Sequence, residues 1–227
     1  SIIGATYSII KQYHKSLEAF QKLTELYPFS FKGHFDLALT YNSLGDDIAS
    51  IKSYNTVITL NPRYFDAYIN LGDIFLRQKK YVKAKEIYSK TLSLNSESPI
   101  TFFKIGKTFL GLNNNGMAKK YFKKSIEIDP NFYESLGELS ILNYQNGNKQ
   151  KAFSQIQQLL KCDTNSENFL FRFGREILSK HSFDDGVIVF NEVLNINPNS
   201  IWGNLFLGRC LYELGEFEQA INSFESQ

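Results

Sequence analysis

Few residues of this 227-residue chain have the types and spacing that chemistry requires. Histidine could act as a general base or bind a metal, but His14, His34 and His181 show no zinc-ligand spacing. They also fall at different positions of a 34-residue sequence repeat, which is described below, so they are not expected to converge. Cys162 and Cys210 also differ in repeat position, so we expect no disulfide and a reducing, intracellular compartment. Neither a G-x-x-x-x-G-K-S/T phosphate loop nor a G-x-S-x-G motif occurs. We therefore predict that the protein is not an enzyme, with no catalytic residue, cofactor or metal site.

The prolines point instead to a repeated architecture. Pro28, Pro62, Pro130 and Pro198 are separated by 34, 68 and 68 residues. Proline marks helix ends because it lacks the backbone N–H that a continuing helix needs. A fixed interval between such residues therefore indicates that one structural unit is repeated along the chain.

Other positions support a 34-residue frame with each proline at position 32. Small residues occupy positions 8 and 20, while bulky residues occupy position 24 at helical spacing from position 20. The position 8 residues are Gly4, Ala38, Gly72, Gly106, Ser140, Gly174 and Gly208, and those at position 24 are Phe20, Tyr54, Tyr88, Phe122, Ile156, Phe190 and Phe224. Each unit is therefore predicted to be two amphipathic helices that approach closely at small residues. Gly45, Gly147 and Gly215, at position 15, mark the turn between them.

This pattern resembles the tetratricopeptide repeat, whose signature has Leu-Gly at positions 7 and 8, Ala at 20, Phe at 24 and Pro at 32. Leu71, Gly72, Ala84 and Tyr88 carry it in one unit. The resemblance implies an all-α fold, a right-handed superhelical solenoid of antiparallel helix pairs. We expect residues 1–227 to form a single array with repeats at 1–30 (partial), 31–64, 65–98, 99–132, 133–166, 167–200 and 201–227 (partial).

Two repeats depart from the pattern. Ser96 and Thr164 stand where the other repeats have proline. Asn143 occupies a site that is normally packed, where an amide without a partner would cost roughly 1–3 kcal/mol. We therefore expect the repeat that begins at Tyr133 to be a softer joint in the array.

If the resemblance holds, the first helix of each repeat lines a concave groove that binds a protein or peptide. The register places in that groove a mixture of charged, amide and aromatic residues, with Trp202 beside them. They are Asn70, Asp73, Phe103, Lys104, Lys107, Glu138, Tyr144, Phe171, Arg172, Arg175, Arg209 and Tyr212. Arginine near aromatic residues is enriched at binding hot spots. We expect a partner whose acidic residues face the lysines and arginines of this set.

Two more specific binding modes are not favoured. Asn70 matches one element of the family's clamp for chaperone carboxylates, but Phe35, Leu39 and Ile100 occupy other clamp positions. The run from Lys119 to Lys124 suggests nucleic-acid binding at first sight. Its lysines fall on the outward-facing side of a second helix, around the packing residue Phe122, so we interpret them as a solvated face. Binding of an acidic partner or of nucleic acid is the alternative.

Composition agrees with an interaction protein. The net charge is only +2, which gives no general attraction to nucleic acid, and no stretch has the roughly 20 apolar residues of a membrane span. We expect a non-catalytic scaffold or adaptor in a larger multiprotein assembly, located in the cytoplasm, with a cilium or another large assembly as alternatives. The alternative function is a substrate-recruiting arm of an enzyme whose catalytic domain lies outside this segment. Uncapped solenoid ends would also permit self-association.

Overall fold

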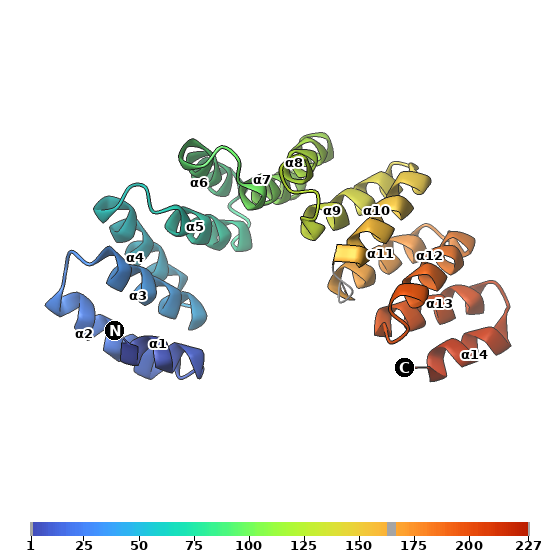
Figure 1. Ribbon diagram of the computed structural model, residues 1–227, viewed down its shortest axis with the longest axis horizontal. Coiled ribbons are helices and arrows are strands. Elements are labelled where there is room, and N and C mark those ends of the chain that lie inside the picture. The colour runs from blue at the N-terminus through green and yellow to red at the C-terminus, as the bar shows by residue number, and fades with distance from the viewer. Residues whose placement is uncertain (1, 163–166, 227) are drawn as a thin grey trace. The chain divides into compact units, whose positions relative to one another are not determined.

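The computed structural model describes residues 2–162 and 167–226, except for the side chain of Cys162. Within those residues there are fourteen α-helices and no strand (Figure 1). They are α1 (Ile2–Ile9), α2 (Tyr13–Leu26), α3 (Phe31–Ser43), α4 (Asp47–Leu60), α5 (Phe65–Arg77), α6 (Tyr81–Leu94), α7 (Pro99–Gly111), α8 (Asn115–Ile128), α9 (Tyr133–Gln145), α10 (Lys149–Cys162), α11 (Glu167–Ser179), α12 (Phe183–Ile196), α13 (Ile201–Glu213) and α14 (Phe217–Glu225). The all-α solenoid predicted from the sequence is confirmed.

The chain forms two compact units, Ser1–Ala118 and Lys119–Gln227, whose boundary falls within α8. In the first unit, α3 packs on α4 and α5 on α6, and each pair packs on the next. The second unit repeats this arrangement from α9 to α14, with α9, α11 and α13 in successive contact. Odd-numbered helices are therefore the first helices of the repeats, and even-numbered helices are the second.

First helices begin where the repeat frame predicts. Their first residues are Phe31, Phe65, Pro99, Tyr133, Glu167 and Ile201. Ser30, Ser98 and Ser200 each precede such a helix, and each side chain accepts a hydrogen bond from a backbone N–H in the first turn. A serine that caps the free N–H groups helps to define where a helix starts.

Small residues at position 8 allow the bulky residue at position 24 to pack between the two helices of a repeat. A Cβ atom added to Gly4 or Gly208 would lie 2.8 Å from the ring of Phe20 or 2.6 Å from that of Phe224. At Gly72 it would overlap the ring of Tyr88. The two helices can approach this closely only because the glycine has no side chain.

The turn between the helices of a repeat has the same backbone conformation in all seven repeats. Gly45, Gly147 and Gly215 have φ of 81°, 79° and 84°. Four residues with side chains occupy the same position in the other repeats with φ of 58°, 58°, 56° and 51°: Lys11, Lys79, Asn113 and His181. The left-handed turn is therefore a property of the repeat, and glycine only makes it less costly.

The absence of proline at Ser96 leaves the helix boundary in place. α6 still ends at Leu94, and α7 begins at Pro99, where proline favours the first turn of a helix. Thr164, the other position without proline, lies outside the described residues. In the described part of the chain, every helix is too short or too polar to cross a membrane.

Candidate partner-binding surface

The structure places the twelve predicted groove residues on first helices, in two separate sets. The first unit holds one set on α5 and α7: Asn70, Asp73, Phe103, Lys104 and Lys107. The second unit holds the other set on α9, α11 and α13: Glu138, Tyr144, Phe171, Arg172, Arg175, Arg209 and Tyr212. The helix assignment follows the predicted register, while the role of these residues in binding stays a prediction.

In the first unit, Asp73 links two adjacent repeats. Its carboxylate accepts a hydrogen bond from the Lys104 ammonium group at 2.8 Å and another from the Tyr88 hydroxyl group at 2.5 Å. Burial, reinforced by Asp73, raises the pKa of Tyr88. Asn70 is also engaged, because its amide donates to the Asp66 carbonyl at 2.8 Å. The positive charge of Lys104 is thus balanced inside the molecule before any partner arrives.

A comparable pair spans repeats in the second unit. Arg172 donates two hydrogen bonds to Glu138, at 2.7 and 2.8 Å. Glu138 is only 4% exposed, so it is a buried carboxylate held by a partly exposed guanidinium. The hydrogen bonds that Arg172 donates to Glu138 raise the pKa of Arg172. The residues are 34 positions apart and occupy the same place in successive repeats.

Beside this pair lies an aromatic shelf, formed by Phe171, Trp202 and Phe206 with Arg175 above it. The ring centroids of Phe171 and Trp202 are 4.4 Å apart, and Trp202 lies 5.9 Å from Phe206. The Arg175 guanidinium lies 5.7 Å from the Phe171 centroid. Glu167 accepts the backbone N–H of Trp202 at 3.2 Å. Phe171 and Trp202 are half-buried and Arg175 is exposed, so the shelf presents both aromatic surface and a cation.

Tyr144 lies in the interior and not on a surface. Its side chain is 1% exposed, and its hydroxyl donates to Asp185 at 3.1 Å. Asp185 also pairs with Lys149 at 2.5 Å. Burial raises the pKa of Tyr144 to about 12. In this conformation a partner cannot contact Tyr144 without displacing its neighbours.

Two further predicted residues, Arg209 and Tyr212, lie on α13. Arg209 pairs with Glu213 at 2.8 Å, one helical turn along. Tyr212 is 53% exposed and packs edge-on against Phe217, with ring centroids 5.5 Å apart. These residues are available at a surface, with the charge of Arg209 already paired.

The run from Lys119 to Lys124 is less uniform than its sequence suggests. Lys119 donates to the side-chain oxygen of Asn143 at 2.5 Å, and burial lowers its pKa. The Asn143 amide in turn donates to Gln155 at 2.6 Å. Phe122 is fully buried, as predicted, whereas Lys120 is exposed. Because Asn143 has two partners, the penalty on which we based a softer joint does not arise.

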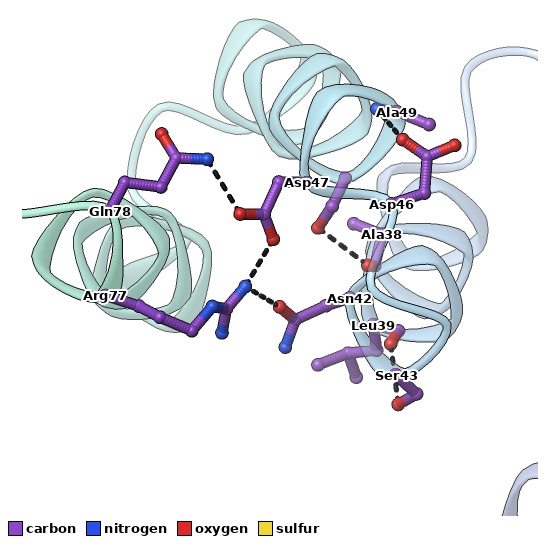
Figure 2. Close-up of polar contacts among 10 residues, drawn as sticks. Ala38, Leu39, Asn42, Ser43, Asp46, Asp47, Ala49, Arg77 and Gln78 are labelled. Carbon is purple, nitrogen blue, oxygen red and sulfur yellow. Dashed lines mark hydrogen bonds and ion pairs between the residues drawn. The ribbon is translucent and has the colours of Figure 1, made fainter.

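The junction of α3, α4 and α5 contains a polar cluster that sequence reasoning did not identify (Figure 2). Arg77 binds the carboxylate of Asp47 and donates to Asn42 at 2.9 Å. Gln78 donates to the other oxygen of Asp47 at 2.7 Å, and this hydrogen bond and Arg77 lower the pKa of Asp47. The sequence contained one signal for this cluster: Asp47 lies in the first turn of α4, in the repeat before the one that contains Arg77. The buried Oε1 atom of Gln78 has no hydrogen-bond partner among the described residues. The cluster joins successive repeats through Arg77 and Gln78, so its geometry indicates a structural role.

The structure places His34 in a hydrogen bond and Cys210 in the interior. No three His, Cys, Asp or Glu side chains gather as metal ligands within residues 2–162 and 167–226. His34 is half-buried, and its ring forms a 2.9 Å hydrogen bond with the Pro28 carbonyl. Cys210 is fully buried, and burial raises its pKa to about 11, which keeps the thiol protonated.

Comparison with known families identifies the repeat directly. A family model described as "TPR repeat" matches residues 38–79, and one described as "Tetratricopeptide repeat" matches 65–98 and 101–132. None of the curated protein sequences matches the chain.

Solved structures share the fold. The crystal structure of MamA is 19% identical, with a TM-score of 0.63, over 71% of this chain and 94% of that chain. YrrB, described as "a TPR protein with an unusual peptide-binding site", is 19% identical with a TM-score of 0.58, over 82% and 96% of the two chains. Pseudomonas aeruginosa pilF is 19% identical with a TM-score of 0.70, over 91% and 94%. At this level of identity the likeness establishes the fold and leaves the partner open.

Proposed function

Since the chain belongs to the tetratricopeptide-repeat family, whose members are protein–protein interaction scaffolds, we propose that it is a non-catalytic adaptor that binds a partner protein in a multiprotein assembly. The observation that carries this proposal is the aromatic shelf of Phe171, Trp202 and Phe206. Phe171 and Trp202 are half-buried and rest on the buried Phe206, with the exposed Arg175 beside them, and aromatic residues next to an arginine are typical of interaction hot spots.

The pattern of ion pairs changes which residues we propose as the main contacts. Lys104, Arg172 and Arg209 each have a carboxylate partner inside the chain. An acidic residue of the partner would have to compete with that carboxylate. A new ion pair formed at an exposed surface contributes only about 0–1 kcal/mol to the free energy of binding. Arg175 has no carboxylate partner among the described residues and lies over Phe171. We therefore propose that affinity comes mainly from the aromatic shelf, with Arg175 selecting a partner that carries an acidic group.

The chain offers a direct reporter of this interaction, because Trp202 is its only tryptophan. Partners found by proximity labelling in the source cell would be purified and titrated while Trp202 emission is followed. We expect the emission to shift on binding, and Phe171→Ala to weaken affinity at least roughly tenfold, as hot-spot truncations do.

A matched control is Phe29→Ala, which removes an aromatic side chain that is 83% exposed in the first unit. It should leave affinity unchanged. The proposal is wrong if partners bind with no change in Trp202 emission and equally well to the Phe171→Ala and Arg175→Glu variants.

A further inference from the structure

A second candidate interaction site lies in the first unit, at the turn between α5 and α6. A shallow cavity of about 410 Å³ opens there, and we refer to it as the turn cavity. Its lining combines three lysines with three residues of apolar character: Lys79, Lys80, Lys83, Tyr81, Val82 and Leu112. The site is built by the helix-to-helix turn and the end of α7, and it is separate from the aromatic shelf.

Within the described part of the chain, the lysines at the turn cavity are not ion-paired, unlike Lys104, Arg172 and Arg209 on the first helices. Lys79, Lys80 and Lys83 are exposed, and none has a carboxylate partner among the described residues. Lys83 lies over the Phe75 ring at 5.9 Å. Lys80 helps to lower the pKa of Asp47, but Arg77 and Gln78 already hold the Asp47 carboxylate. Three cations thus surround the cavity without being neutralised at close range.

The floor of the cavity is apolar. Val82 and Leu112 are 58% and 40% exposed, and Tyr81 is half-buried against Gly111, where a Cβ atom would overlap its ring. A larger cavity along α4, of about 520 Å³, is lined by a single cation, Lys52. The turn cavity therefore combines an apolar surface with several cations, whereas the α4 cavity has only one cation among its described lining residues.

We propose that the turn cavity docks an acidic peptide segment of a partner protein, with one apolar side chain of that segment on Val82 and Leu112 and its carboxylates facing the lysines. The cation count favours a peptide. Three lysines fall short of the roughly four to eight that mark a lipid-binding basic cluster. They also fall short of the roughly 6–10 phosphate contacts of a strongly salt-dependent protein–DNA complex.

The test is fluorescence anisotropy of the 227-residue chain with a labelled peptide in which one phenylalanine is flanked by glutamates. We expect saturable binding that weakens with salt and weakens when alanine replaces the phenylalanine. Lys80→Glu with Lys83→Glu should reduce affinity roughly tenfold or more. The control is Lys90→Glu, an exposed lysine on the same helix that does not line the cavity, and it should bind as the parent does.

Lys79→Gly separates lost binding from lost folding. Lys79 has φ of 58°, a conformation that glycine adopts without strain, so this variant should melt at a higher temperature while binding the peptide more weakly. Three outcomes would overturn the proposal: no binding of the peptide, equal binding by the cavity variants, or binding of phosphatidylserine vesicles or single-stranded RNA in place of the peptide. None of these outcomes bears on the aromatic shelf, whose residues lie in the other unit.

Discussion

His34 and Tyr68 occupy the same position of successive repeats, and each forms the same hydrogen bond. The His34 ring contacts the Pro28 carbonyl at 2.9 Å, and the Tyr68 hydroxyl donates to the Pro62 carbonyl at 3.0 Å. The carbonyl before each first helix has no helical partner, so a polar side-chain tip one turn into that helix satisfies it. A histidine that could have suggested chemistry is therefore explained by a backbone group that recurs with the repeat.

Buried tyrosines make stability sensitive to alkaline pH. The pKa of Tyr144 rises from 10.0 to about 12 because the hydroxyl is buried, so between these values the folded state keeps a proton that the unfolded state releases. Its stabilising contribution is complete below about pH 10 and is lost as pH rises towards 12. In chemical denaturation between pH 9 and 12 we expect Tyr144→Phe to flatten this decline. An equally steep decline in the variant would contradict the assignment.

At the scale of helices, side-chain contacts join each repeat to the next. Asp73 with Lys104 and Glu138 with Arg172 connect consecutive first helices, and Arg77 connects α5 to α3 and α4 (Figure 2). Repeat proteins derive their stability from such nearest-neighbour interfaces together with the packing inside each repeat. The charged residues on first helices therefore contribute to stacking as well as to a surface.

In the repeat that begins at Phe65, close approach of the two helices depends on Gly72, the glycine at position 8. Gly72→Ala would force a Cβ atom into the Tyr88 ring, and we expect a loss of about 1–3 kcal/mol in the free energy of unfolding. Gly116→Ala is the matched control, since its nearest neighbouring atom would be 3.8 Å away in the same unit. That change should stabilise by up to about 1 kcal/mol, because alanine favours helix more than glycine does. Urea denaturation followed by circular dichroism compares the two, and equal effects would contradict the packing argument.

At the scale of the whole molecule, we propose that residues 1–227 act as one continuous array, although their contacts divide them into two compact units. The boundary falls inside α8, a helix whose residues belong to both units. A single helix shared in this way would couple the stability of one unit to that of the other.

Hydrogen exchange tests this coupling. Gly174→Ala would place a Cβ atom in the Phe206 ring of the second unit and destabilise it. In one cooperative array, amides of α5 and α6 in the first unit would also exchange faster in the variant. Unchanged exchange in α5 and α6, with faster exchange in α11 and α13, would show two independent units.

The sequence by itself determined the repeat, its register and its helix boundaries, because small, bulky and proline residues recur every 34 positions and these local preferences act within one helix pair. It also placed the proposed contact residues on first helices. Only the tertiary structure decided which of them are buried or ion-paired within the chain, and which other lysines border a cavity. Tyr144 is buried and Lys104 and Arg172 are ion-paired, whereas Lys79, Lys80 and Lys83 border a cavity. Those facts depend on contacts between repeats some 30 residues apart, which a repeat pattern does not encode.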